Sequence, residues 1–173
     1  MKKIILLFIV VIPLIANCVL PLSVNASGIK EGKTNYSGVF YETNFDKGLA
    51  HWSYNENVTI QQKNGNNYAL LSGYTDCDPI GPCRPVLAMM QLKLGGAKPG
   101  ATYTFSIKAI GIGKIAVNSS SYQISVDDGS AALDIDNAKT YSTTFTADNE
   151  GKIQITILGS GTKIAVDDVK INN

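Results

Sequence analysis

Near the end of the chain stands Gly161-Thr162-Lys163-Ile164-Ala165-Val166-Asp167-Asp168-Val169-Lys170-Ile171, an apolar strand interrupted by two adjacent carboxylates. Alternate residues of a strand share a face, so Asp167, Val169 and Ile171 are predicted to point the same way. If Val169 and Ile171 face the core, Asp167 must be hydrogen-bonded or hold a metal, because burying an unpaired carboxylate is costly. A second interpretation is that the Asp167-Asp168 pair marks a bulge or a sheet edge and is simply solvated.

Short β-rich runs, separated by Gly, Asn, Asp and Pro, fill the chain upstream of this stretch. The run 86–93 fits helical spacing only partly, and its neighbours are strands, so we interpret it as a strand. Regular spacing without helical stretches predicts a β-sandwich or barrel. The predicted strands are 57–62, 68–72, 86–93, 102–109, 114–118, 122–126, 140–146, 152–158 and 162–172.

Four segments, in order, resemble the motifs of carbohydrate-binding modules of the family 4/9/22 type. They are the opening Thr43–Trp52, the Pro-Gly-x-x-Tyr strand within Lys98–Ser106, the strand Thr140–Thr146 and the terminal Asp167-Asp168-Val169. The resemblance covers residues 41 to 172. It implies an all-β fold, a jelly-roll β-sandwich of two antiparallel sheets that is galactose-binding-domain-like.

The resemblance also implies a structural calcium ion. Its ligands here would be Asp46, the backbone carbonyl near Lys63 or Asn64, and Asp167. Calcium suits such a set because it accepts six to eight oxygen ligands in loose geometry. Asp46 stands where the family usually has the longer Glu, and Glu42 could take its place. Without an ion, Asp167 would instead accept hydrogen bonds from backbone amides.

The N-terminus has the pattern of a secretory signal peptide, residues 1–26. Lys2 and Lys3 precede an apolar run that is short for a membrane span, and cleavage is expected after Ala26. A second interpretation makes Cys18 a lipidated cysteine, but Asn17 argues against it because a smaller residue usually stands there. Residues 27–38 are predicted to be a flexible lead-in, and 39–173 the module. The protein is therefore expected to be secreted or on the cell surface, without membrane insertion.

The charge of the chain is nearly balanced. Removing residues 1–26 takes away two lysines and no acid, which leaves 13 basic and 14 acidic residues. This near-balance excludes a strongly basic surface of the kind that binds nucleic acid. Arg84 is the only arginine and His51 the only histidine. Because anionic sugars are usually met by cationic partners, this composition predicts a neutral polysaccharide or glycan as partner.

Two cysteines, Cys77 and Cys83, remain after the predicted cleavage. In an exported chain they are expected to form a disulfide, and the intervening Pro79, Gly81 and Pro82 favour the tight turn this requires.

Sugar binding needs aromatic faces for stacking and flanking polar groups for the hydroxyls. Trp52 and Tyr103 correspond to core positions of the family. The candidate ligand-binding residues are Tyr54, Tyr74, Gln91, Tyr122 and Gln123, although each tyrosine could equally be a half-buried sheet residue.

The sequence has no Gly-x-Ser-x-Gly, His-Glu-x-x-His or phosphate-loop motif. We therefore expect a monomeric, noncatalytic carbohydrate-binding module. The alternatives are a structural or protein-interaction sandwich without a sugar site, and a small polysaccharide lyase or hydrolase. Fold analogy alone does not establish function.

Overall fold

Eleven β-strands and one short 3-10 helix, η1 (Ile135–Asn137), make up the part of the chain that the structure, a computed structural model, describes. That part comprises residues 39–118, 122–127 and 133–173. The predicted signal peptide, its cleavage site, Cys18 and the lead-in 27–38 lie outside the described residues. No helix in the described part is long and apolar enough to cross a membrane.

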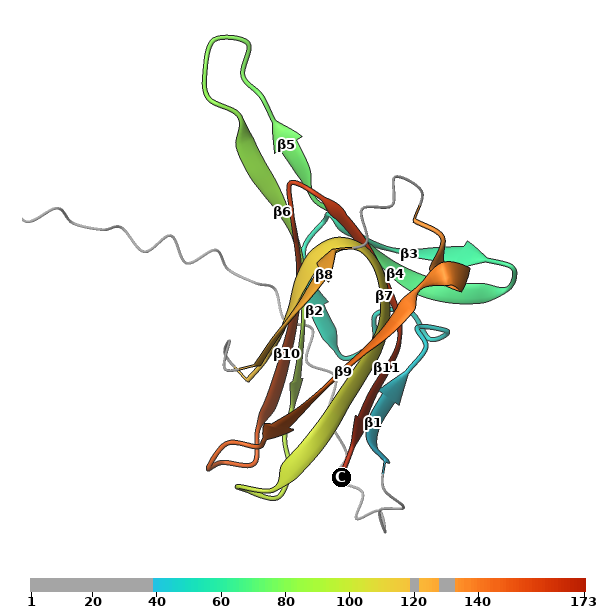
Figure 1. Cartoon of the computed structure of the whole chain (residues 1–173), viewed down its shortest axis with the longest axis vertical. Helices are drawn as coiled ribbons and strands as arrows, with labels where there is room; N and C mark the ends of the chain where they lie inside the picture. The colour runs from blue at the N-terminus through green and yellow to red at the C-terminus, as the bar shows by residue number, and fades with distance from the viewer. Residues whose placement is uncertain (1–38, 119–121, 128–132) are drawn as a thin grey trace, which may run out of the picture. The chain divides into compact units, whose positions relative to one another are not determined.

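The strands form two antiparallel sheets, which confirms the predicted fold class (Figure 1). In sheet A, β11 is flanked on one side by β4 and β1 and on the other by β7, with β3 beyond β4 and β9 beyond β7. Its strands are β1 (Val39–Thr43), β3 (Val58–Lys63), β4 (Asn66–Ser72), β7 (Thr102–Val117), β9 (Lys139–Thr146) and β11 (Lys163–Asn172).

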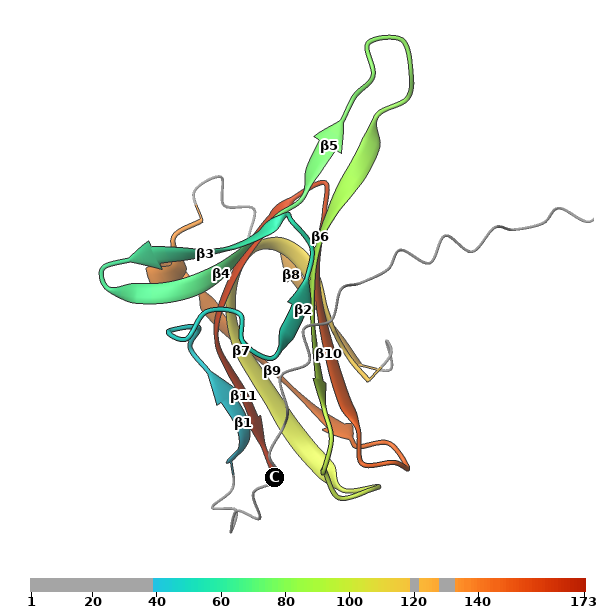
Figure 2. The same ribbon diagram turned by 180° about the vertical axis from the view of Figure 1, so that it is seen from behind.

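Sheet B has the order β2-β6-β10-β7-β8. The short strand β5 (Tyr74–Asp76) pairs with the start of β6, and this hairpin projects beyond the sheets (Figures 1 and 2). At its tip Cys77 and Cys83 form the predicted disulfide. The remaining strands of sheet B are β2 (Trp52–Tyr54), β6 (Arg84–Leu94), β8 (Tyr122–Asp127) and β10 (Ile153–Ser160).

The long strand β7 belongs to both sheets. Its first half pairs with β9 and β11, and its second half pairs with β8 and β10. The sequence predicted two strands here, 102–109 and 114–118. The two are continuous because Gly111 adopts φ 108°, a conformation that lets the backbone bend between the sheets without ending the strand.

The core lies between the sheets and follows the two-residue alternation of the strands. In sheet B, the apolar residues Met90 and Leu92 of β6 and Ile155 and Ile157 of β10 are fully buried. Trp52 and Tyr103 are also buried, as predicted, and the Trp52 indole donates a hydrogen bond to the Tyr41 hydroxyl (3.1 Å).

A bulge in β11 changes the expected direction of Asp167. The register of β11 against β7 shifts between Asp167 and Lys170, and Asp168 has φ 46°. The extra residue reverses the alternation. Val166 and Val169 therefore both face the core, and Asp167 shares a face with Ala165 instead of with Val169 and Ile171. The prediction of a bulge is therefore confirmed. The prediction that the pair is solvated is wrong for Asp167, which is 2% exposed.

Candidate functional site

The outer face of sheet B, the side away from the core, carries a row of mostly polar residues. Successive register pairs join Ser53 of β2, Gln91 of β6, Thr156 of β10, Ala116 of β7 and Gln123 of β8. The Gln91 amide donates a hydrogen bond to the Thr156 hydroxyl (3.1 Å). The two predicted ligand residues Gln91 and Gln123 thus lie on one face, with β10 and β7 between them.

Two further rows flank this one. On one side, Met89 pairs with Leu158, Leu158 with Lys114, and Lys114 with Ser125. On the other side, Lys93 pairs with Gln154. Among the residues whose side chains are described, none on this face is aromatic.

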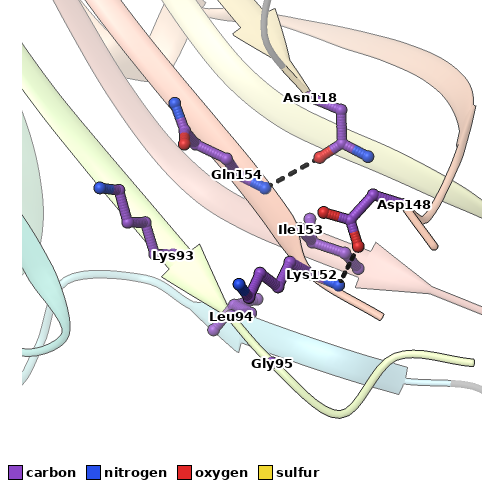
Figure 3. Close-up of a pocket in the computed structure, with 8 residues that line it drawn as sticks. All are labelled: Lys93, Leu94, Gly95, Asn118, Asp148, Lys152, Ile153 and Gln154. Atoms are coloured by element: carbon purple, nitrogen blue, oxygen red, sulfur yellow. Dashed lines mark hydrogen bonds between the residues drawn. The ribbon is translucent and has the colours of Figure 1, made fainter. Parts of the chain in front are cut away.

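A cavity of about 540 Å³ opens where the Lys93–Gln154 row meets the loops at the end of sheet B (Figure 3). Leu94, which is partly buried, supplies apolar surface, whereas the Ile153 side chain packs into the core. The polar lining consists of Lys93, Asn118, Asp148, Lys152 and Gln154.

Several polar groups of this cavity are already engaged by the fold. The Asn118 side chain accepts a hydrogen bond from the Gln154 backbone N–H and donates one to the Thr146 carbonyl, both at 2.9 Å. One carboxylate oxygen of Asp148 accepts the backbone N–H groups of residues 150 and 152. The Lys152 amine pairs with Glu150, which raises the pKa of Lys152.

Three polar groups of the cavity have no partner among the described residues. They are the second carboxylate oxygen of Asp148, the side-chain amide of Gln154 and the amine of Lys93. An acceptor, a mixed donor-acceptor and a cation therefore lie around the apolar surface of Leu94. Such a set can hold a hydroxylated ligand.

The predicted aromatic residues lie elsewhere. Tyr54 pairs with Met90 and Tyr74 with Val86, positions of β6 that alternate with Gln91 and so belong to the opposite face. Both rings are about half exposed, at 49% and 51%. Tyr122 of β8 pairs with Val117 of β7, and the Tyr122 side chain lies outside the described part of the structure.

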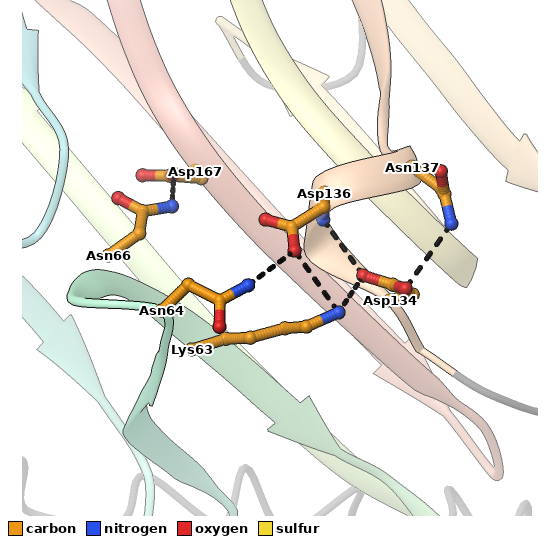
Figure 4. A network of polar contacts seen from close by, with 7 residues as sticks. All are labelled: Lys63, Asn64, Asn66, Asp134, Asp136, Asn137 and Asp167. Carbon is orange, nitrogen blue, oxygen red and sulfur yellow. Dashed lines mark hydrogen bonds and ion pairs between the residues drawn. The ribbon is translucent and has the colours of Figure 1, made fainter.

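Asp167, the buried carboxylate of β11, accepts two hydrogen bonds. One comes from the Asn66 amide (2.8 Å; Figure 4). The other comes from the Asp168 backbone N–H (2.7 Å). Burial raises the pKa of Asp167 above the ordinary value for aspartate. The predicted partner Asp46 is exposed, and it accepts bonds from Asn44 (2.6 Å) and Asn67 (3.4 Å).

Asn66 and Asn67 are neighbours on β4, so their side chains, which hold Asp167 and Asp46, point to opposite faces of the strand, and the structure does not bring the two carboxylates into contact. Lys63 pairs with Asn66 across the β3–β4 hairpin, so its backbone also lies near Asn66. Glu42 lies on β1 in an ion pair with Lys170 (3.3 Å). Within the described ranges, no three His, Cys, Asp or Glu side chains form a group that could hold a metal ion.

The Lys63 side chain serves a different purpose, which sequence reasoning missed (Figure 4). Its amine forms ion pairs with Asp134 and with Asp136 (3.2 Å), at the start of η1. Lys63 lowers the pKa of Asp134 through this contact. The pairs attach η1 to the β3–β4 hairpin, over the outer face of sheet A.

The cavity residues were not predicted from the sequence either, and only Asp148 belongs to a local motif that could have indicated it. Asp148-Asn149-Glu150-Gly151 is a typical turn sequence, and Asp148 indeed accepts the backbone N–H two residues on. Nothing in the sequence joins this turn to Lys93 or Asn118.

The sequence matches no protein-family model and no curated protein. A solved structure of Clostridium thermocellum endo-1,4-beta-D-xylanase 10B, CBM22-1-GH10 modules with xylohexaose, is similar at 12% identity and TM-score 0.52, over 80% of this chain and 29% of that chain. The CBM22-1 xylan-binding domain of Paenibacillus barcinonensis Xyn10C has 13% identity and TM-score 0.47, over 78% and 94% of the two chains. The K3 cleaved adhesin domain of Porphyromonas gingivalis Lys-gingipain has 16% identity and TM-score 0.47, over 78% and 99%. At these identities the likeness concerns the fold, and the chain has the jelly-roll fold found among carbohydrate-binding modules, as its motifs predicted.

Proposed function

We propose that this protein is a noncatalytic glycan-binding module and that a glycan lies along the outer face of sheet B with one sugar residue in the cavity at its end. The observation that carries the proposal is the continuity between the Gln91–Thr156–Gln123 row and the cavity. The two share a face and together offer polar contacts across four strands.

The chemistry of the cavity supports a sugar as its occupant. Leu94 can contact the C–H face of a pyranose ring, while Asp148 and Gln154 can accept and donate hydrogen bonds to its hydroxyls. Each such hydrogen bond contributes only about 0.5–1.5 kcal/mol net, so several are needed for measurable affinity. The row on sheet B supplies them along a longer chain.

Tyr54 and Tyr74 remain candidates for an aromatic contact, at the edge formed by β2 and β5. They would bind a different part of a glycan, because they belong to the opposite face of sheet B. A contact from Tyr122 also stays a prediction.

The proposal is tested by calorimetry against xylan, β-glucan, mannan, chitin oligosaccharides and polygalacturonate. Gln154→Ala and Gln91→Ala should each weaken binding several-fold, because each removes a hydrogen-bonding side chain from the site. Gln61→Ala is the matched control, since Gln61 is exposed on β3 of the other sheet. If the folded protein binds no glycan, the structural or protein-interaction alternative takes precedence.

The arrangement of carboxylates supports a noncatalytic role. Glycoside hydrolysis generally needs two carboxylates that flank the scissile bond. Asp148 is the single carboxylate among the residues that line the cavity. We therefore expect no release of reducing sugar from any glycan that binds, and measurable turnover would favour the lyase or hydrolase alternative.

A structural calcium ion near Asp167 is a separate proposal. Asp167 and Asp46 are carboxylates held by neighbouring asparagines of β4, and carboxylate and amide oxygens are the donors that calcium prefers, but Asp46 would have to move toward Asp167 to share an ion with it. Asn66 would present its amide oxygen in place of the nitrogen that now donates to Asp167. The Lys63 or Asn64 carbonyl would complete the set, and the ion would stabilise the junction of β4 and β11 without a role in sugar chemistry.

Export is proposed from the N-terminal sequence. Intact-mass measurement of the secreted protein should give a chain that starts at Ser27 and lacks two hydrogens for the Cys77–Cys83 bond. A lipid-modified chain that starts at Cys18 would contradict this expectation.

A further inference from the structure

Two lysines on the outer face of sheet B, Lys93 and Lys114, have no ion-pair partner among the described residues. From their placement we infer that the glycan bound there is anionic and that its carboxylate or sulfate groups pair with these two amines. The inference rests on the proposed glycan site and specifies the class of its ligand.

The lysines of the opposite face provide a contrast. In the middle of the outer face of sheet A, Lys108 pairs with Asp168 (2.6 Å) and Lys170 with Glu42 (3.3 Å). These cations are neutralised within the protein. The charges of Lys93 and Lys114 are left for solvent or for a ligand.

The described residues of this face include no aromatic side chain, which also favours an anionic ligand. A neutral glycan held without stacking depends on ordinary hydrogen bonds, which compete with water. Hydrogen bonds between a lysine and an anionic group are roughly twice as strong as neutral ones. A face that has cations and no rings is therefore better suited to a charged ligand.

The geometry fits an extended chain. Lys93 on β6 pairs with Gln154, and Lys114 on β7 pairs with Leu158, so the two lysines are two strands and two rows apart. Ideal sheet spacings place their Cα positions roughly 16 Å apart. Several sugar residues of one chain would span this distance and cross Thr156, which lies between the two rows.

Two carboxylates also lie on this side, but neither forms an ion pair with Lys93 or Lys114 among the described residues. Asp148 lies in the cavity, where its charge acts on Lys152. Asp127 pairs with Ile112 at the end of β8, one row beyond Lys114, and forms no ion pair within the described residues. The anionic ligand inferred here differs from the neutral ligand predicted from composition, because residue counts do not show which lysines are paired.

The experiment compares polygalacturonate with its fully methyl-esterified form, which has the same backbone without the charges, and dextran sulfate with dextran. The protein variants are K93Q/K114Q and, as a control with the same change in net charge, K139Q/K163Q. Lys139 and Lys163 are exposed residues of sheet A that form no ion pair in the described part of the chain. Circular dichroism verifies that each variant is folded.

We expect the wild type to bind an anionic polymer at least about tenfold more tightly than its neutral counterpart, and K93Q/K114Q to lose about tenfold in affinity while the control retains it. The difference should shrink in high salt, which screens exposed charges. Preference for polygalacturonate or for dextran sulfate identifies carboxylate or sulfate.

Other outcomes overturn the inference. Equal binding to the charged and neutral polymers, or equal losses in the two double variants, would contradict it and leave the glycan site in place. No binding to any glycan by the folded protein would overturn the proposed function as well.

Discussion

Asp167 is a carboxylate that the fold buries without a cation in hydrogen-bonding contact. Its two oxygens accept from the Asn66 amide and the Asp168 backbone N–H, and the positive charge of Lys108, which pairs with Asp168, favours its charged form from a greater distance. Desolvation outweighs these favourable contacts and raises its pKa. Asp167 is thus costly in its charged form and well placed to gain from a bound cation.

The sign of this shift leads to a prediction about pH. A carboxyl group whose pKa is higher in the folded state favours folding when it is protonated, and this contribution is lost as pH rises through the folded pKa. Without calcium, Asp167→Asn should therefore gain stability relative to the wild type as pH rises from about 4 to 7. Urea denaturation of both proteins in chelator measures the difference, and a constant difference over this range would argue against it.

At the scale of elements, β7 joins the two sheets through the bend at Gly111. A side chain there would overlap the Lys163 carbonyl oxygen and would have to adopt φ 108°. We predict that Gly111→Ala destabilises the protein by at least about 2 kcal/mol.

Gly95→Ala is the control for this prediction, because a methyl group at Gly95 would meet no atom within 4 Å. Thermal or urea denaturation should show a large loss of stability for Gly111→Ala and little change for Gly95→Ala. Similar stabilities for the two variants would mean that the bend tolerates a side chain.

The longer strands could be predicted from sequence because alternation over six or more residues is a strong signal. Three short strands, β1, β2 and β5, were not among the predicted ones. Strands of three to five residues have too little alternation to detect, and these three exist because β11 and β6 offer them an edge. The sequence could not decide whether a bulge occurs at Asp168 for a similar reason, since the bulge depends on the register of β11 with β7.

The candidate site was harder to predict than the fold. Gln91 and Gln123 could be placed on strands that line a sheet face, and the structure puts them in one row. The cavity combines Lys93, Asn118 and Asp148, which are far apart in sequence and come together through strand pairing. Sequence motifs indicated the strands but not the partners that each strand acquires.

At the scale of the whole molecule, the proposed calcium ion would couple stability to the solution. An ion that binds the folded chain alone adds about 2.7 kcal/mol at a hundredfold excess over its dissociation constant. We predict that calcium raises the melting temperature, that chelator lowers it, and that Asp167→Ala removes the difference. Identical melting curves in calcium and in chelator would mean that no calcium ion binds and that Asp167 is held by its hydrogen bonds alone.

The position of β11 has a consequence for how the protein is made. This strand lies between β7 and the pair β4 and β1, yet it is the last described strand in chain order. A ribosome therefore releases it after the ten strands that precede it, and sheet A cannot close before then. The nascent chain therefore lacks the strand that joins β7 to β4 and β1 until residues 163–172 have been made.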